Sequence, residues 1–107
     1  MKADPNFPPG WHNLADLLDE SGRLTGAIDC ERRALDADPQ YTDAMFNLAL
    51  FLQRVGNYAE AATWWTRYLE RDRTSEWAAR AKRAWKYCEM ELATAASNNP
   101  TAQAVRA

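Results

Sequence analysis

The chain is poor in residues that carry catalytic or metal chemistry. Its 107 residues include one histidine, four glycines and two cysteines. Cys30 and Cys88 form no CxxC pair and lie in different predicted elements, so a disulfide or a zinc site has little support. Reduced thiols in a cytoplasmic protein are the simpler interpretation. The glycines form no phosphate-binding loop, and we expect no cofactor and no metal.

Long apolar runs and a strong net charge are also missing. No apolar run approaches the roughly 18 residues that a bilayer-spanning helix needs. The N-terminus, MKADPNFPPG, has no apolar signal-peptide segment. The net charge of −2 does not mark the whole chain as a binder of nucleic acids. We therefore expect neither a membrane nor a nucleic acid as partner.

Candidate catalytic groups are few. His12 has no cysteine or serine partner at a recognisable spacing. Asp16, Asp19 and Glu20 cluster in one segment, but their spacing is not that of a calcium-binding EF-hand loop. We interpret them as a solvated acidic face and predict no catalytic activity. An enzyme that uses these carboxylates is the competing hypothesis.

The strongest positive feature is an internal repeat. Residues 8–41 and 42–75 align without a gap, so each position of the first unit has its equivalent at one fixed offset in the second. The two units share nine identical positions: Asn13/Asn47, Leu14/Leu48, Ala15/Ala49, Leu18/Leu52, Gly22/Gly56, Ala27/Ala61, Arg33/Arg67, Leu35/Leu69 and Asp38/Asp72. This period is typical of stacked helical hairpins, which cannot bury their apolar faces alone. It predicts a surface that holds another protein.

Apolar spacing and end signals predict where the helices lie. The predicted helices cover residues 9–21, 24–37, 42–55, 58–71 and 76–96. Gly22 and Gly56 are expected to end the first and third helices in the left-handed conformation. Thr42 and Ser75 are expected N-caps, and Asn57 begins a capping box with Glu60. Residues 97–107 are small and polar, which predicts a disordered tail.

The pattern also extends to the N-terminus. Residues 3–7 match residues 37–41 at the same offset. The chain thus begins where a previous repeat would finish. We expect it to be a fragment of a longer protein, and the alternative is a gene that starts within the repeat pattern.

These repeats resemble the tetratricopeptide repeat (TPR) family. Its pattern is W-x2-L-G-x2-Y, followed by alanine, an aromatic residue, alanine and proline. The matching residues are Trp11, Leu14, Ala15, Leu18, Ala27, Ala34 and Pro39 in the first unit, and Met45, Leu48, Ala49, Leu52, Ala61 and Trp65 in the second. Glu31, Tyr68 and Arg73 depart from it. The resemblance implies an all-α, right-handed solenoid over residues 1–96, with two TPR hairpins and a C-terminal solvating helix.

The resemblance also implies a binding groove. TPR proteins bind peptide segments in a concave groove lined by the first helix of each hairpin. By resemblance, the groove residues are His12, Asn13, Asp16, Asp43, Phe46, Asn47, Leu50, Arg54 and Arg80, flanked by Pro9, Glu20, Ala81 and Ala84. Asn13 and Asn47 stand where many TPRs grip the ligand backbone with an amide, which donates and accepts at once. The alternative is that both asparagines only face water.

One TPR subfamily is disfavoured by the sequence. Carboxylate-clamp TPRs hold a C-terminal carboxylate with lysine and arginine around that asparagine. The corresponding positions here carry His12, Trp77 and Ala81, while Arg80 is one residue away from such a place. We therefore do not expect recognition of that type.

Function and partners follow from the resemblance. We expect a non-catalytic scaffold for a protein or peptide ligand, with homo-oligomers through exposed repeat ends as a further expectation. The alternative is a C-terminal regulatory domain of a larger bacterial regulator, since some MerR-type DNA-binding regulators carry similar short TPR segments. Among the tryptophans, Trp11, Trp65 and Trp85 are predicted to be core, whereas Trp64 and Trp77 are predicted to be partly exposed.

Overall fold

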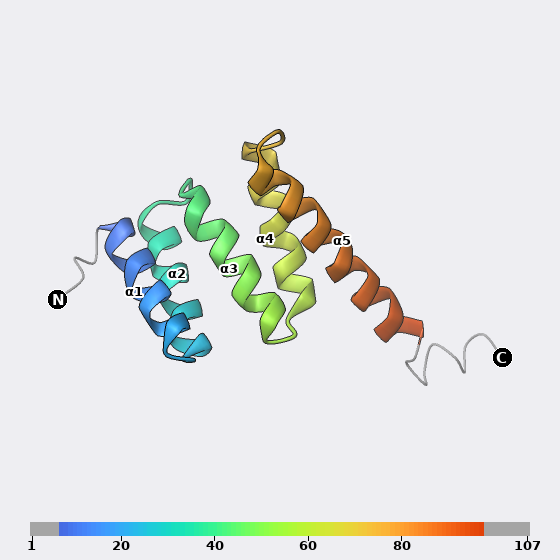
Figure 1. Ribbon diagram of the computed structural model, residues 1–107, viewed down its shortest axis with the longest axis horizontal. Coiled ribbons are helices and arrows are strands. Elements are labelled where there is room, and N and C mark those ends of the chain that lie inside the picture. Colours follow the sequence, from blue (N-terminus) through green and yellow to red (C-terminus); the bar gives the residue numbers. More distant parts are fainter. Residues whose placement is uncertain (1–6, 98–107) are drawn as a thin grey trace.

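The fold is a stack of α-helices. The computed structural model describes residues 7–97, and over this range every regular element is helical. The elements are α1 (Pro8–Glu20), α2 (Leu24–Ala37), α3 (Thr42–Arg54), α4 (Tyr58–Arg71) and α5 (Glu76–Ser97). The stack runs in one direction from α1 to α5 (Figure 1). The prediction of an all-α solenoid is confirmed.

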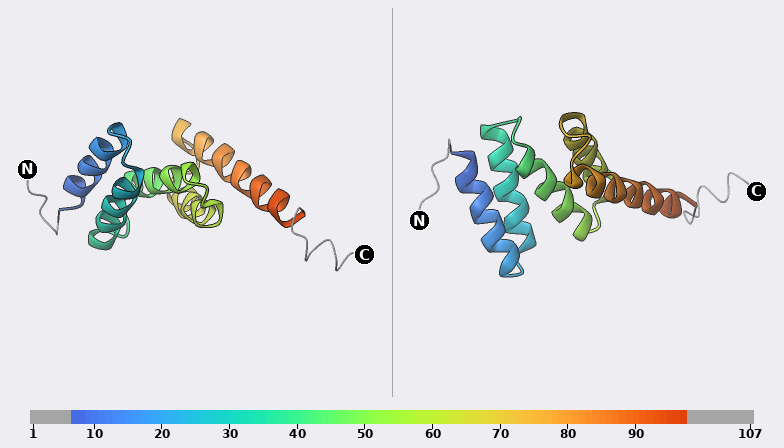
Figure 2. Two further views of the ribbon diagram at one scale, coloured as in Figure 1. Left: turned by 90° about the horizontal axis from the view of Figure 1, so that it is seen from below. Right: turned by 45° about the horizontal axis from the view of Figure 1, so that its top comes forward.

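Two helical hairpins and a closing helix make up the stack. Helices α1 and α2 form the first hairpin, α3 and α4 the second, and α5 packs on α4. Figure 2 shows α5 at the end of the stack, extending beyond α4. No helix in residues 7–97 is both long and apolar enough to cross a membrane.

Most helix ends follow the local chemistry of the sequence. Gly22 and Gly56 have φ angles of +78° and +84°, the left-handed conformation that glycine adopts without strain. The side-chain oxygen of Asn57 accepts a hydrogen bond from the Glu60 backbone amide at 3.4 Å. The hydroxyl of Ser75 accepts one from the Ala78 amide at 3.1 Å. These four end signals are confirmed.

Several predicted boundaries need correction. Helix α1 begins and ends one residue earlier than predicted, at Pro8 and Glu20, and α3 ends one residue earlier, at Arg54. Thr42 is not an N-cap, because the carbonyl of Tyr41 already accepts a hydrogen bond from the Met45 amide at 3.2 Å. Tyr41 is the N-cap residue instead. Helix α5 includes Ser97, which was assigned to the tail, and the rest of the expected tail lies outside the described residues.

The core lies between the helices of each hairpin and continues along the stack. Trp65, Phe51 and Leu48 are among its largest fully buried side chains. Several alanines have no exposed surface: Ala15, Ala27, Ala34, Ala44, Ala49, Ala61, Ala78 and Ala81. Because alanine ends in a single methyl group, the helix backbones can pack closely at these positions.

The tryptophans divide differently from the prediction. Trp65 is buried, and Trp11 and Trp64 pack against the core while partly exposed. Trp77 is 54% exposed, which confirms its assignment. Trp85 is 37% exposed, so its assignment to the core is wrong. Helix spacing identifies the side of α5 on which Trp85 lies, but a core also needs a helix to cover that side.

Candidate functional site

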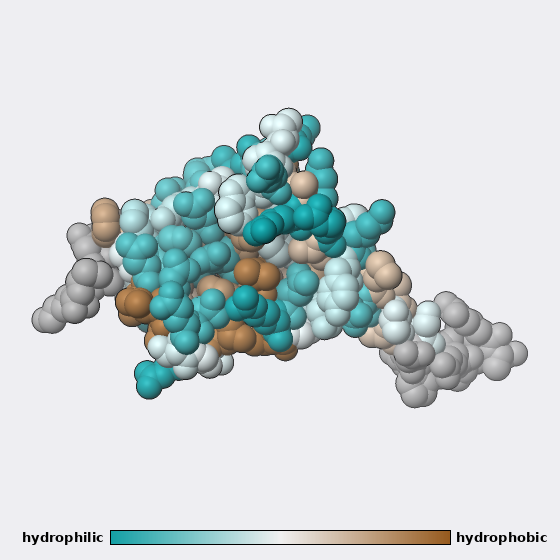
Figure 3. All heavy atoms as spheres, viewed as in Figure 1, coloured by the Kyte–Doolittle hydropathy of each residue, from teal (hydrophilic) through white to brown (hydrophobic). Residues whose placement is uncertain are grey.

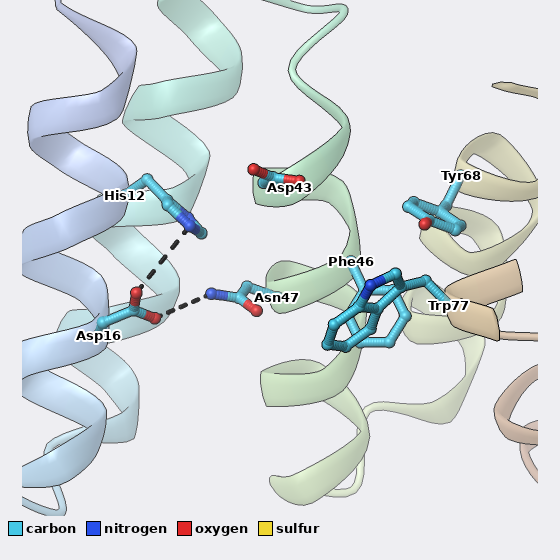
Figure 4. A pocket seen from close by; sticks show the side chains of 7 residues that line it. All are labelled: His12, Asp16, Asp43, Phe46, Asn47, Tyr68 and Trp77. Atoms are coloured by element: carbon cyan, nitrogen blue, oxygen red, sulfur yellow. Dashed lines mark hydrogen bonds and ion pairs between the residues drawn. The ribbon is translucent and has the colours of Figure 1, made fainter. Parts of the chain in front are cut away.

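A hollow opens on one side of the solenoid, along the first helices of the hairpins. Its volume is about 430 Å³. The lining residues come from four helices: His12 and Asp16 from α1, Asp43, Phe46 and Asn47 from α3, Tyr68 from α4, and Trp77 from α5. Figure 4 shows these side chains around one space. The hollow thus contains five of the nine residues predicted to form the groove.

One end of the hollow is acidic. Asp16 and Asp43 line it, and the buried Glu31 lies behind His12. The Nδ1 atom of His12 lies 3.1 and 2.9 Å from the two carboxylate oxygens of Glu31, so Nδ1–H is the donor to that carboxylate. The Nε2 atom of His12 lies 3.9 Å from a carboxylate oxygen of Asp16. The imidazole is therefore held between two acids.

The surroundings of His12 and Glu31 shift the pKa values of both side chains. The hydrogen bond from His12 to Glu31 raises the pKa of His12, and desolvation opposes this only in part. Burial raises the pKa of Glu31, while the hydrogen bond and charge of His12 lower it. Glu31 has no exposed surface, and a buried carboxylate needs a partner of opposite charge. His12 supplies that partner from the neighbouring helix.

The same two places in the second repeat carry an aromatic pair. Phe46 and Trp65 are the repeat equivalents of His12 and Glu31, and their ring centroids are 4.8 Å apart. The departure of Glu31 from the family's aromatic residue is therefore matched by His12 on the facing helix. One hairpin uses an ion pair where the other uses two rings in edge-to-face contact.

The opposite end of the hollow is aromatic. The ring of Phe46 makes edge-to-face contacts with Trp65, Tyr68 and Trp77, at centroid distances of 4.8, 5.2 and 5.4 Å. The guanidinium of Arg80 lies 5.1 Å from the centroid of the Trp77 ring. This end offers ring faces and edges to a ligand side chain.

Tyr68 is held in place by a hydrogen bond of its own. Its hydroxyl donates to a carboxylate oxygen of Asp72 at 2.8 Å. Burial and this hydrogen bond raise the pKa of Tyr68 to about 12. The phenol therefore stays neutral at physiological pH and keeps its ring at the wall of the hollow.

The two equivalent asparagines have different surroundings. The side-chain amide of Asn47 is half-buried and donates to Asp16 at 3.0 Å, across from α3 to α1. Its amide oxygen points away from Asp16 (Figure 4). Asn13 is exposed and does not line the hollow. For Asn47, the alternative of an amide that only faces water is wrong.

The other three predicted groove residues do not line the hollow. Leu50 packs partly buried against the core. The guanidinium of Arg54 is 2.8 Å from a carboxylate oxygen of Asp19, which links α3 to α1. Arg80 stacks on Trp77 and is exposed.

Three site residues were missed by sequence reasoning, although each carried a signal. Tyr68 replaces the small Ala34 of the first unit, and this larger side chain reaches the hollow. Trp77 is one repeat period after Asp43, so the repeat itself assigns it to the groove. Glu31 was noted only as a departure from the family pattern.

The acidic cluster considered as an enzyme site does not converge on one point. Asp16 accepts a hydrogen bond from Asn47, and Asp19 pairs with Arg54. Glu20 is exposed at the end of α1. Within residues 7–97, histidine, cysteine and carboxylate side chains form no group of three suited to a metal ion.

The surface of the molecule is mixed in character. Figure 3 shows hydrophilic residues over much of the visible face, with hydrophobic patches between them. Among the exposed large apolar side chains are Leu17, Val55, Trp77 and Trp85. Trp77 is the one of these four that lines the hollow described above.

Comparison with known proteins agrees with this architecture. Two tetratricopeptide repeat family models match, one over residues 8–41 and the other over residues 30–63. The chain is 37% identical over 62 residues to a peroxisomal targeting signal receptor of Candida glabrata, and 34% identical to those of Saccharomyces cerevisiae and Kluyveromyces lactis. Each alignment covers 58% of this chain.

The relatives are much longer than this chain, which spans about a tenth of their length. They come from yeasts, so they lend no support to the alternative of a larger bacterial regulator. The repeats and these relatives support a role in binding proteins or peptides. From the repeated helical hairpins and the family matches, the chain belongs to the tetratricopeptide repeat family.

Proposed function

We propose that this chain is a non-catalytic scaffold that binds a peptide segment of another protein in the hollow between α1, α3 and α5. The observation that carries the proposal is the two-ended lining, acidic at Asp16 and Asp43 and aromatic at Phe46, Tyr68 and Trp77. A space of about 430 Å³ suits one or two side chains of a ligand. The relatives are named receptors of a targeting signal, which also favours a short peptide ligand.

The lining defines the chemistry of the ligand. A basic side chain fits the end with Asp16 and Asp43, because two carboxylates there attract positive charge. An apolar or aromatic side chain fits against Phe46 and Trp77. Between them, the amide oxygen of Asn47 is positioned to accept from a ligand backbone amide. The ligand is therefore extended, with its basic residue toward the first repeat.

The test uses short end-blocked peptides that carry one arginine and one tryptophan at varied separations. Calorimetric titration should detect binding for the separation that spans the hollow. A matched set with glutamate in place of arginine should bind much more weakly, because the acidic end would repel it.

Variants of the chain complete this test. Trp77→Ala and the double variant Asp16→Asn/Asp43→Asn should each weaken binding by about tenfold or more, since each removes one end of the site. Trp85→Ala is the matched control, because Trp85 is an exposed tryptophan of the same helix outside the hollow. Binding that tolerates both groove variants, or equal binding of arginine and glutamate peptides, would overturn the proposal.

Two further expectations stay proposals. We place the chain in the cytoplasm because both of its cysteines are free, buried thiols. The alternative function, a regulatory domain of a larger MerR-type regulator, has no support from the geometry of residues 7–97. Sequencing the gene upstream of Met1 would test it directly.

A further inference from the structure

A second hollow lies between α4 and α5. Its volume is about 460 Å³, and its lining is Thr66, Leu69, Glu70, Arg73, Lys82 and Trp85. None of these residues lines the proposed peptide groove. The proposed peptide binding therefore does not account for this second hollow.

The repeat shows what kind of element covers this surface. A third hollow lies between α2 and α4 and includes Arg32, Leu35, Asp36 and Pro39. These positions are the repeat equivalents of Thr66, Leu69, Glu70 and Arg73, so the α4 side of the second hollow corresponds to the α2 side of the third. In the third hollow, Trp64 and Arg67 of α4 form the facing wall. In the third hollow, a helix therefore covers the surface of α2 that is equivalent to the α4 side of the second hollow.

The exposure of one repeated position supports this conclusion. Leu17, Phe51 and Trp85 occupy the same position in successive repeat periods and are 59%, 1% and 37% exposed. Only Phe51 has a hairpin before its helix and a helix after it. Trp85 has the preceding hairpin, but residues 7–97 contain no helix after α5. A covering helix in the place that α4 takes beside α3 would bury it.

The chemistry of the α5 face specifies the covering helix. Leu48 and Leu52 of α3 are buried, whereas Lys82 and Lys86 stand at the equivalent positions of α5. A covering helix with an apolar packed face, such as that of α4, would bury both lysines. Burial of a charged side chain is costly without a partner of opposite charge. The ammonium of Lys82 donates to the Arg73 carbonyl at 3.3 Å, which leaves it further donors. The covering helix must therefore combine an apolar centre with acidic residues.

Helix α5 itself has this composition. Lys82, Trp85 and Glu89 recur at intervals of three and four residues, so they lie on one face. If two α5 helices cross antiparallel near Trp85, Lys82 of each copy meets Glu89 of the other, and Lys86 of each copy meets the Trp85 ring of the other, where a cation–π contact offsets its burial. The face is thus complementary to itself, as an interface with two-fold symmetry requires. The antiparallel direction is also that of α4 against α3 within the hairpin.

We propose that the chain forms a two-fold symmetric homodimer through α5, in which the α5 of one copy covers the hollow lined by Leu69, Lys82 and Trp85 of the other. The two Trp85 rings lie near the two-fold axis, and two Lys82–Glu89 pairs flank them. The peptide groove stays open, because Trp77 lines a different hollow. The dimer does not depend on the proposed function.

Sedimentation analysis from micromolar to millimolar protein tests the dimer. The wild-type chain should sediment with twice the mass of one chain at the upper end, and its melting temperature should rise with concentration. Trp85→Ala should abolish dimerisation, because it removes the apolar centre. Circular dichroism melts of each variant establish that it is folded.

Charge reversal provides the decisive comparison. Lys82→Glu and Glu89→Lys should each weaken the dimer by about tenfold, since each creates two like-charge contacts. The double variant Lys82→Glu/Glu89→Lys should restore it. Arg83→Glu is the matched control, because Arg83 lies about 100° round the helix from Lys82.

Two outcomes would overturn the proposal. One is a chain that stays monomeric at every concentration, which would assign this face to another protein or to residues outside 7–97. The other is a dimer that the single charge reversals leave unchanged, or that the double variant fails to restore, which would place the dimer interface elsewhere.

Discussion

At the scale of single residues, His12 and Glu31 distinguish this chain most clearly from a simple repeat. They form an ion pair at the positions where Phe46 and Trp65 meet edge to face in the second hairpin. A buried ion pair costs desolvation that a pair of rings does not, so it is weak evidence for stability. Its clearer consequence is that the hydrogen bond to Glu31 raises the pKa of His12 above its usual 6.5.

The first prediction concerns pH. Because the pKa of His12 is raised above its usual 6.5, the folded chain retains a proton that the unfolded chain loses as the pH rises. The free energy of unfolding should therefore fall as the pH rises above about 6.5, the ordinary pKa of histidine, whereas below that pH the contribution of His12 is fully present. Urea unfolding at a series of pH values measures this slope.

Two variants serve as controls for the pH prediction. His12→Gln and Glu31→Gln should both lose the slope, because neither retains the ion pair. His12→Phe/Glu31→Leu should also lose it while staying folded, since an apolar pair can replace a buried ion pair at little cost. A slope that persists in His12→Gln would assign the titration to another group.

The second prediction concerns Asn47. Asn47→Ala should weaken peptide binding by about 1–3 kcal/mol if the amide pairs with a buried ligand backbone. It should also lower stability by about 1 kcal/mol, because the hydrogen bond to Asp16 is lost. Titration calorimetry and thermal melts measure the two effects.

Asn13→Ala is the matched control for this prediction. Asn13 occupies the same repeat position but is exposed and lies outside the hollow, so both measurements should match those of the parent. Unchanged peptide binding by Asn47→Ala would contradict the role of its amide. Loss of folding would identify Asn47 as a structural residue instead.

At the scale of helices, the turn after α3 holds the second hairpin together. The φ angle of +84° at Gly56 is one that residues with a Cβ atom rarely adopt, although a Cβ there would meet no other atom within 4 Å. The constraint at this turn is therefore conformational rather than steric.

The third prediction tests this turn. Gly56→Ala should lower the free energy of unfolding by about 1–2 kcal/mol, the cost of placing an L-residue in the left-handed region. Gly56→Asn should cost less, because asparagine tolerates this conformation better. Chemical denaturation of the three proteins measures the order. Equal stability of the alanine and asparagine variants would show that conformation at this position is not what matters.

At the scale of the whole molecule, stability is distributed along the stack, because each helix contacts mainly its neighbours. The two free cysteines report on different parts of it. Cys30 lies in α2, which has a helix on each side, whereas Cys88 lies in the terminal helix α5. Burial raises the pKa of both thiols, so both should react slowly in the folded chain.

The fourth prediction is a difference in thiol reactivity. In single-cysteine variants under native conditions, Cys88 should react with a thiol reagent faster than Cys30, because α5 can open without α2. Rates measured at low protein concentration, where the chain is monomeric, make the comparison. If Cys30 and Cys88 instead react at the same rate, and that rate equals the rate of global unfolding, the stack opens as one unit.

Much of this protein could be predicted from its sequence, because the relevant physics is local. Helical periodicity, the glycines at φ near +80° and the caps at Asn57 and Ser75 depend on residues close in the chain. Helices α2 and α4 begin and end at the predicted residues. The period of the repeat also determined which helices form hairpins.

Only the tertiary structure decided which repeated positions are buried and which side chains meet. Leu17, Phe51 and Trp85 share one repeat position, yet their exposure depends on which helices flank them. The contacts of His12 with Glu31 and of Asn47 with Asp16 join residues far apart in the chain and cross between helices. A sequence period specifies which face each side chain takes, whereas the packed neighbours on that face determine its burial, its charge partners and its place in a site.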